Sequence, residues 1–231
     1  MKPIRSASRG FTLVELLVVI MIVLVLAVLG FLGAKRFIEN AKKTQALAQF
    51  RDLTVGLTMF ETDYGKPPIP ENKKYNGDDT VYGDPDPTYH NGVIVGVLAG
   101  EEGDYTSGRS GETYTVREMN PRMVSYITFP LAEKGKSGVG EDGNLYDPWG
   151  NEVIMAVNSF AARDKSITSF NGGMNDRRLY TWGLGEYNET KPRDQSFVFW
   201  SYGKDGLKGD GVTPPTKVTS LKKSDDVVSW Y

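Results

Sequence analysis

The feature that most constrains this chain is an apolar run near its N-terminus. Between Phe11 and Ala34, 20 of 24 residues are Ala, Val, Ile, Leu, Met or Phe, and no charged residue occurs from Leu16 to Ala34. At 1.5 Å per residue, a helix of this length measures about 36 Å, enough to cross a hydrocarbon layer of about 30 Å. The run is longer than the roughly 7 to 15 apolar residues of a secretory signal peptide. We therefore expect residues 11–34 to form a transmembrane helix that is retained in the mature protein.

One carboxylate interrupts the start of this run. Glu15 lies near the expected membrane boundary, where a charge needs either water or a counter-charge. Position alone leaves both possibilities open. If the chain is cut between Gly10 and Phe11, the new α-amino group of Phe11 lies four residues from Glu15. An amine at that depth on a neighbouring subunit would neutralise the carboxylate and favour one axial offset between packed subunits.

The N-terminal sequence resembles a known processing site. Residues Arg9-Gly10-Phe11-Thr12-Leu13-Val14-Glu15, between a short basic leader and the apolar run, look like the prepilin peptidase site of type IV pilins and type II secretion pseudopilins. The resemblance implies that residues 1–10 are a leader peptide cleaved after Gly10, that Phe11 becomes the N-methylated terminus, and that Glu15 is the assembly charge. It also implies a single-pass protein of the bacterial inner membrane, with a cytoplasmic N-terminus and a periplasmic C-terminal domain.

The helix is expected to continue as an amphipathic helix over residues 35–65. Apolar residues recur there at spacings of 3 and 4, which place them on one helix face and exclude the alternation of a strand. They are Ala46, Phe50, Leu53, Leu57, Phe60 and Tyr64. Gly65, with Pro67 and Pro68 behind it, is the expected end. The pattern predicts one long helix whose second half packs on a domain.

Residues 66–231 are expected to form that globular domain, with a loop-rich insert at about 72–144. Within the insert, the apolar run Val93–Leu98 is either a buried strand or part of a helix that continues to Gly100. Asn120-Pro121 is expected to open a helix that runs to Phe129. His90, the only histidine of the chain, has no evident partner and is not expected to be catalytic or to bind a metal.

From Leu145 onward the sequence is typical of β-structure. A turn at Asp147–Asn151 precedes the strand candidate Val153–Val157, and Phe197–Tyr202 is the strongest strand candidate of the chain. The turn Asp147-Pro148-Trp149-Gly150 and the loop Ser201–Gly206 resemble the major (G-type) pseudopilin of type II secretion. That resemblance implies the type IV pilin-like fold, an α+β fold in which a long N-terminal helix packs on a small antiparallel β-sheet domain.

The same resemblance implies a calcium site in the C-terminal loop, residues 203–230. Matching residue by residue assigns carboxylate ligands to Asp205, Asp225 and Asp226, the last two lying ahead of Trp230, with Asp210 as a possible substitute. Ca²⁺ takes six to eight oxygen ligands, which carboxylates and backbone carbonyls supply. The loop is not an EF-hand, because the repeated acidic positions of that motif are missing. An ordinary acidic loop remains the alternative.

Composition excludes several classes of function. With 27 basic and 29 acidic residues, the chain has no basic excess with which to neutralise nucleic acid. It has no cysteine, which removes disulfides, thiolate catalysis and Cys-ligated metals. Its sequence also lacks a nucleophile elbow, a P-loop and a dinucleotide-binding fingerprint. We therefore expect a structural subunit and not an enzyme.

The resemblance implies a subunit of the type II secretion pseudopilus. Such a subunit is processed by prepilin peptidase and assembles with itself, with minor pseudopilins and with an inner-membrane assembly platform. The product is a periplasmic filament that drives protein export across the outer membrane. Two alternatives remain: a type IV pilus pilin, and a membrane-anchored carbohydrate-binding or hydrolytic module.

Overall fold

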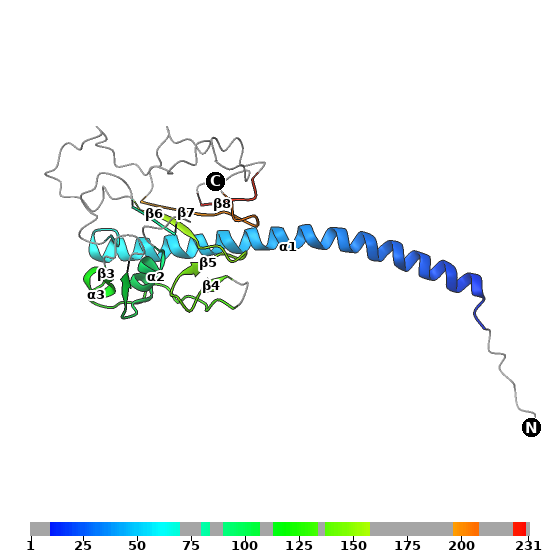
Figure 1. Cartoon of the computed structure of the whole chain (residues 1–231), viewed down its shortest axis with the longest axis horizontal. Coiled ribbons are helices and arrows are strands. Elements are labelled where there is room, and N and C mark those ends of the chain that lie inside the picture. Colours follow the sequence, from blue (N-terminus) through cyan, green and yellow to red (C-terminus); the bar gives the residue numbers. More distant parts are fainter. Residues whose placement is uncertain are drawn as a thin grey trace, which may run out of the picture. The chain divides into compact units, whose positions relative to one another are not determined.

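A computed structural model of the chain describes residues 10–69, 80–83, 90–106, 113–133, 137–157, 196–207 and 224–229. The chain divides into two compact units, Met1–Ala41 and Lys42–Tyr231. The described elements are α1 (Leu13–Tyr64), β1 (Thr80–Tyr82), α2 (Gly92–Ala99), β2 (Asp104–Thr106), β3 (Thr113–Thr115), α3 (Val116–Met119), β4 (Gly138–Val139), β5 (Leu145–Tyr146), β6 (Ile154–Val157), β7 (Phe197–Ser201) and β8 (Val227–Val228) (Figure 1). They form a mixed α and β structure with small antiparallel sheets, consistent with a pilin-like fold.

Helix α1 is the single long helix that the sequence predicts. It spans 52 residues and stops at Gly65, whose φ of 65° is left-handed and whose N–H donates to the carbonyl of Glu61 at 2.8 Å. Glycine adopts this conformation without the steric cost of a Cβ. Both ends therefore lie within two residues of the expected bounds.

In the first unit, the described apolar side chains of α1 from Leu13 to Val28 are exposed in the single chain. Among the described residues, no helix qualifies as a membrane-spanning segment.

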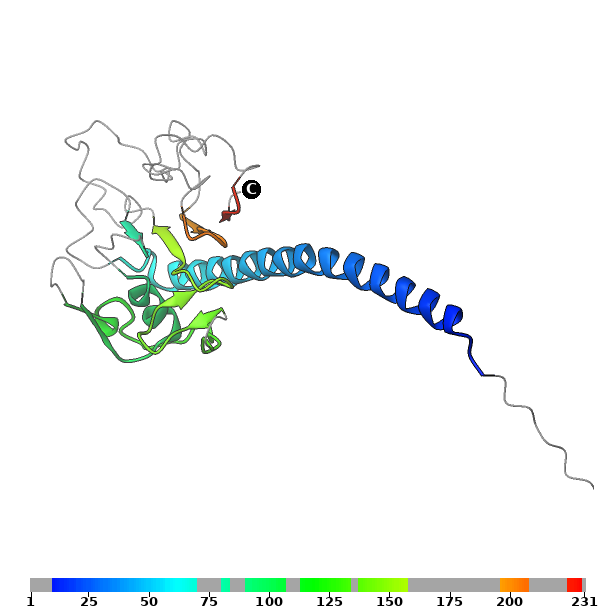
Figure 2. The ribbon, with the colours of Figure 1, turned by 45° about the vertical axis from the view of Figure 1, so that its right-hand side comes forward.

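In the second unit, the side chains on one face of α1 are buried in the hydrophobic core. The side chains of Ala46, Phe50, Leu53, Leu57 and Phe60 are at most 1% exposed, as the 3–4 spacing predicts. The rings of Phe50 and Phe199 of β7 stack with their centroids 6.0 Å apart. Figures 1 and 2 show the Lys42–Tyr64 part of α1 between the β1-β6-β7-β8 sheet on one side and α2 on the other.

The four-stranded sheet has the order β1-β6-β7-β8, and every neighbouring pair is antiparallel. In its centre, Ile154 pairs with Trp200 and Ala156 with Val198. All residues of β6 and β7 are buried. The two strands predicted from the sequence are thus confirmed, with ends that differ by one residue.

The apolar run Val93–Leu98, for which the sequence allowed either a buried strand or a helix, is helical. It lies in α2, which ends at Gly100 in a left-handed conformation (φ 67°, ψ 27°). A Cβ at Gly100 would lie 2.8 Å from the carbonyl oxygen of Met123, so neither the backbone angle nor the space admits another residue easily. Every residue of α2 up to Leu98 is buried, and this part of the insert therefore belongs to the domain core.

The helix expected from Asn120 to Phe129 is wrong. Helix α3 ends at Met119, and the chain from Asn120 to Phe129 is not helical. Asn120 is fully buried, and its side-chain amide donates to the carbonyls of Val97 (2.9 Å) and Val124 (2.8 Å). Its Oδ1 accepts the hydroxyl of Tyr64 at 2.7 Å. These bonds tie the segment to α1 and α2 and replace the helical pattern that Asn-Pro suggests.

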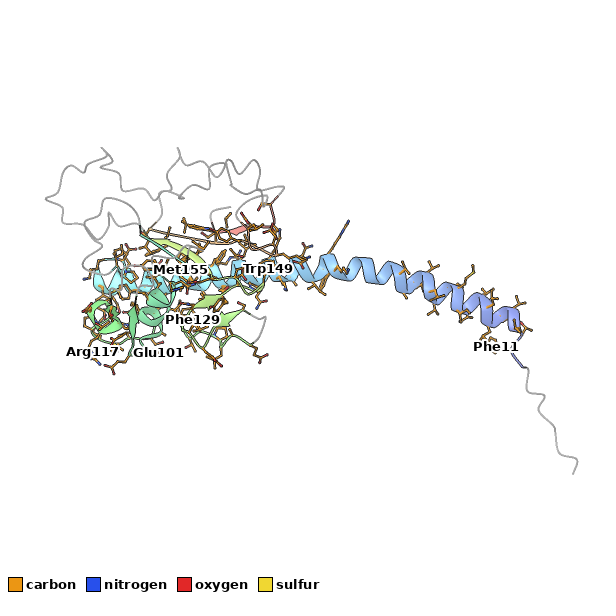
Figure 3. All side chains as sticks on the ribbon, in the orientation of Figure 1. Phe11, Glu101, Arg117, Phe129, Trp149 and Met155 are labelled. Carbon is orange, nitrogen blue, oxygen red and sulfur yellow. The ribbon has the colours of Figure 1, made fainter. Side chains whose placement is uncertain are left out.

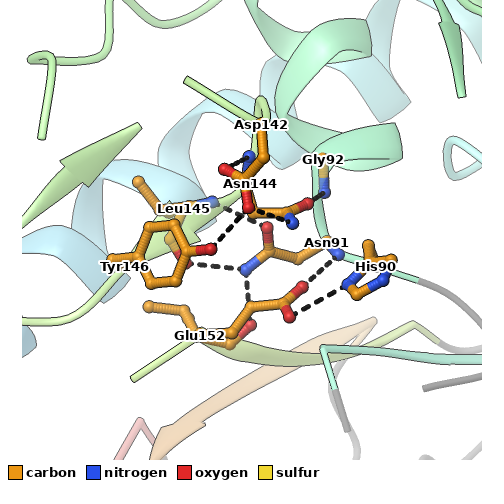
Figure 4. Close-up of polar contacts among 9 residues, drawn as sticks. His90, Asn91, Gly92, Asp142, Asn144, Leu145, Tyr146 and Glu152 are labelled. Atoms are coloured by element: carbon orange, nitrogen blue, oxygen red, sulfur yellow. Dashed lines mark hydrogen bonds and ion pairs between the residues drawn. The ribbon is translucent and has the colours of Figure 1, made fainter. Parts of the chain in front are cut away.

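A second buried asparagine joins α2 to the β-strands (Figure 4). The Nδ2 of Asn91 donates to the carbonyls of Leu145 (2.9 Å) and Val153 (2.7 Å), and its Oδ1 accepts the N–H of Leu145 at 2.7 Å. The amide therefore takes the place of a backbone peptide between two segments. Beside it, Glu152 accepts the N–H of Asn91 at 2.8 Å and contacts Nδ1 of His90 at 3.1 Å. His90 thus has a partner that the sequence did not reveal.

Candidate functional site

The predicted cleavage point lies just ahead of α1. Gly10 and Phe11 precede the first helical residue, Leu13, and Phe11 is 81% exposed (Figure 3). Apart from its neighbours in the chain, none of the described residues has an atom within 4 Å of the place that a Cβ on Gly10 would take. The fold of the single chain therefore imposes no packing requirement for glycine here, and the peptide bond between Gly10 and Phe11 is accessible. Residues 1–9 of the expected leader lie outside the described residues.

Thr12 and Glu15 form a reciprocal cap on the first turn of α1. The N–H of Thr12 donates to Oε2 of Glu15 at 2.8 Å, and the N–H of Glu15 donates to Oγ1 of Thr12 at 3.2 Å. The hydroxyl of Thr12 also donates to Oε2 at 2.8 Å. This is a capping box, in which Thr and Glu three residues apart satisfy two N–H groups that the helix leaves without partners. The cap was missed in the sequence, although the pattern Thr-x-x-Glu before an apolar run is its signature.

The cap gives the carboxylate a defined position. One oxygen of Glu15 is held by two donors of Thr12, and the negative charge faces the positive end of the helix dipole. A carboxylate fixed at the helix start, three residues after Thr12 and close to the predicted cleavage point, can act as an oriented acceptor for a cationic group.

A second candidate site is the turn that follows β7. Both the N–H of Lys204 (2.6 Å) and the N–H of Asp205 (3.0 Å) donate to Oδ2 of Asp225. Gly203 has a φ of 66°, and a Cβ on it would lie 2.5 Å from the carbonyl oxygen of Asp225. The close approach of the two segments therefore depends on glycine. The backbone of Asp205 thus contacts the carboxylate of Asp225, whereas the carboxylate of Asp205 accepts the N–H of Leu207 at 2.8 Å.

The turn Asp147–Asn151 is joined directly to this second site. The fully buried carboxylate of Asp147 accepts the backbone N–H groups of Trp149 and Asn151, both at 2.8 Å, and the hydroxyl of Ser201. Nδ2 of Asn151 donates to the carbonyl of Gly203 at 2.5 Å. The sequence indicated both turns but not this connection, because nothing in either turn identifies the other as its neighbour.

The donor set for calcium is incomplete within the described residues. No group of three or more acidic or histidine side chains is placed to hold a metal among them. Asp226 is 7% exposed and lies next to Asp225, while Asp210 and Trp230 lie outside the described residues. Asp205 lies on the glycine-rich turn, and Asp225 and Asp226 lie on the C-terminal segment that contacts it. Carboxylates are ligands that Ca²⁺ prefers, and backbone carbonyls would have to supply the remaining ligands.

Comparison with known proteins gives one match, at the N-terminus. Residues 5–31 match the prokaryotic N-terminal methylation motif, and this range contains Gly10, Phe11, Thr12 and Glu15. No curated protein and no solved structure matches the chain. The motif is typical of envelope-associated structural subunits, and it implies assembly into pilin-like filaments. It indicates a type IV pilin-like substrate of prepilin peptidase.

Proposed function

We propose that the chain is a structural subunit of a type II secretion pseudopilus. The observation that carries the proposal is the methylation motif at residues 5–31, with the accessible Gly10–Phe11 bond and the capped Glu15 inside it. In this proposal prepilin peptidase removes residues 1–10, and Phe11 is methylated at its new amino group. Before assembly, the subunit is held in the inner membrane with its C-terminal domain in the periplasm.

The exposed apolar surface of α1 supports assembly through this helix. From Leu13 to Val28 its side chains are exposed all round in the single chain, and such a helix needs lipid or other helices around it. Glu15 is held at the helix start by Thr12, with its charge available to the methylated amine of a neighbouring subunit. Pairing these charges favours one offset between subunits, which is what a helical filament requires.

The intact mass of the protein recovered from membranes tests the proposal. We expect a mass that lacks residues 1–10 and carries one additional methyl group. An uncleaved chain, or a chain cut after Ala34, would contradict it. A deletion strain separates a pseudopilus from a pilus: loss of secreted proteins with intact surface pili supports the pseudopilus, and loss of pili with intact secretion assigns the chain to a pilus instead.

We also propose that Asp205 and Asp225 hold a calcium ion with Asp226. The support is the contact between the turn after β7 and the C-terminal segment, in which the N–H of Asp205 donates to Asp225 and Gly203 permits the two segments to approach. A bound divalent cation would fasten the C-terminal segment in a chain that has no cysteine for a disulfide.

A further inference from the structure

The two fully buried asparagines of the domain differ in the residue that follows each of them. The side-chain amides of Asn91 and Asn120 both use their oxygen and their nitrogen in hydrogen bonds. Asn91 precedes Gly92, whereas Asn120 precedes Pro121. Glycine has no side chain and keeps its backbone N–H, while proline has no N–H. Of these two asparagines, only Asn91 is therefore followed by an unhindered backbone nitrogen that can act as a nucleophile.

An asparagine followed by glycine is prone to spontaneous deamidation. The backbone nitrogen of Gly92 would lose its proton and attack Cγ of Asn91, which forms a cyclic imide and releases Nδ2 as ammonia. Water would then open the imide at either of its carbonyl groups and give aspartate or isoaspartate. The reaction needs no enzyme and no co-reactant except water. It does need a backbone and a side chain that are free to bring this nitrogen against Cγ.

The folded domain blocks each step of this reaction (Figure 4). The N–H of Gly92, which carries the nucleophile, donates to Oδ1 of Asn144 at 3.1 Å. The side chain of Asn91 is held by its bonds to Leu145 and Val153, so Cγ cannot turn toward Gly92 until these bonds break. The backbone of Asn91 is helical (φ −71°, ψ −13°), and the residue is 0% exposed, which keeps water away.

The products of deamidation do not fit the site that Asn91 fills. Its Nδ2 donates to two buried carbonyl oxygens, those of Leu145 (2.9 Å) and Val153 (2.7 Å). Aspartate would place a carboxylate oxygen against these two acceptors and would bury a charge beside them. Even a protonated carboxyl group donates one hydrogen where the amide donates two. Isoaspartate would also lengthen the backbone at the start of α2. Neither product can restore the connection between α2 and the strands.

We propose that Asn91-Gly92 is a modification site whose reactivity depends on the fold. It deamidates spontaneously while the chain is unfolded, it is unreactive in the folded domain, and its products prevent the domain from folding again. The site thus limits the time for which a chain can stay unfolded and still reach the native state. This inference depends on contacts within the domain and is independent of the proposed role in secretion.

Peptide mapping by mass spectrometry tests the reactivity of the site. The full-length protein is incubated in detergent at mildly alkaline pH, with or without enough guanidinium chloride to abolish its near-ultraviolet circular dichroism. In the denaturant, Asn91 should deamidate and Asn120 should not. Without denaturant, deamidation of Asn91 should be at least about tenfold slower, because it then requires local unfolding. Asn76-Gly77 in the same digest shows that the denaturing conditions support the reaction.

Two results of this experiment would overturn the proposal. One is an equal rate of deamidation at Asn91 with and without denaturant, which would show that the fold does not protect the site. The other is an unmodified Asn91 in denaturant in which Asn76 reacts, which would show that the unfolded chain is not at risk there.

Refolding after removal of the denaturant tests the consequence of the modification. The protease-resistant, refolded fraction should be depleted of chains modified at residue 91, relative to the protease-sensitive fraction. Asn91→Asp, which encodes one of the products, should fail to give the protease-resistant domain. The control Asn40→Asp, at an exposed position of α1, should give it at the natural yield. Equal modification of residue 91 in the two fractions, or refolding of Asn91→Asp at the yield of Asn40→Asp, would overturn this part of the proposal.

Discussion

Oε2 of Glu15 lies 2.8 Å from both the backbone nitrogen and the hydroxyl oxygen of Thr12, so that the carboxylate proposed for filament assembly is also part of a helix cap. The two roles make different demands on the side chain. The cap needs an acceptor of the right length, which glutamine also provides. Neutralising an amine needs a negative charge.

Glu15→Gln and Glu15→Ala separate these roles. We expect both variants to enter the membrane normally and both to lose most filament assembly, because neither can neutralise the amine of Phe11. Membrane fractionation and the yield of sheared filaments measure the two effects. Assembly by Glu15→Gln at the natural level, with loss in Glu15→Ala, would instead assign the importance of Glu15 to the cap.

Periodicity in the sequence predicted the parts of the fold that depend on local repetition. The 3–4 spacing of Ala46, Phe50 and Leu53 repeats over the second half of α1 and correctly marks the buried face. Strands β6 and β7 follow in the same way from apolar runs bounded by turn residues. These signals work because each residue's role is set by neighbours a few positions away.

The two buried asparagines show why the rest could not be predicted. Asn120 bonds to Val97, 23 residues earlier, and Asn91 bonds to Leu145 and Val153, 54 and 62 residues later. Its neighbours in the sequence predict that Asn120-Pro121 starts a helix. The hydrogen bond to the distant Val97 instead stabilises a non-helical segment. The contact of Asp147 with Ser201 could not be predicted either, because the two residues are 54 positions apart in the sequence. The Thr12–Glu15 cap, in contrast, could have been predicted from its spacing of three residues.

Removal of the Asn91 amide should destabilise the domain strongly. Asn91→Ala would leave the N–H of Leu145 and the carbonyls of Leu145 and Val153 without their side-chain partner in a buried site. We expect the free energy of unfolding to fall by about 3 kcal/mol. Denaturant unfolding measures it, with Gln45→Ala on the exposed face of α1 as a control that should change it by less than about 0.5 kcal/mol. Equal, small effects in both variants would contradict the proposed join between α2 and the strands.

The Tyr146–Asp142 pair should make the free energy of unfolding depend on pH in the alkaline range. Burial, and then the hydrogen bond to Asp142 at 2.5 Å, raises the pKa of Tyr146 to about 12. The unfolded chain, with a tyrosine pKa of about 10, releases its proton first, so the native state binds more protons between these values. The part of the unfolding free energy that comes from protonated Tyr146 is therefore complete below about pH 10, and it is lost as pH rises toward 12. Tyr146→Phe should reduce the fall in unfolding free energy across that interval, and an unchanged slope would contradict the assignment.

The carboxylate of Asp142, in the same pair, should make the free energy of unfolding depend on pH in the acidic range. Burial alone would raise the pKa of Asp142, but hydrogen bonds from Tyr146 and Asn144 outweigh it and lower the pKa below its usual value. The stabilisation is present above the pKa of the unfolded aspartate and is lost as pH falls through the lower native value. Asp142→Asn should therefore flatten the loss of stability on acidification. Urea unfolding at a series of pH values below 5 compares this variant with the natural chain, and parallel losses in both would contradict the assignment.

Calcium should raise the melting temperature of the full-length protein in detergent, because a ligand that binds the native state alone stabilises it. Asp225→Ala should remove most of that rise, since Asp225 joins the turn of Lys204 and Asp205 to the C-terminal segment. Glu102→Gln serves as the control and should retain the full response. Equal melting temperatures in excess calcium and in chelator would reject the calcium site and leave the turn as a hydrogen-bonded closure.

Gly56 is expected to resist substitution even though it lies inside a helix. A Cβ there would lie 2.3 Å from Cδ1 and 2.4 Å from Cγ1 of Ile127, which packs directly on the helix backbone. Alanine favours a helix over glycine by about 1 kcal/mol, but the collision should cost about 1–3 kcal/mol. Gly56→Ala should therefore be neutral or destabilising, and Ile127→Ala alone should lose packing against the core. In the double variant the collision is absent and the helix preference remains, so the two changes should be less damaging together than their sum. A double-mutant cycle of unfolding free energies measures this coupling, and strict additivity would show that Ile127 can move aside without cost.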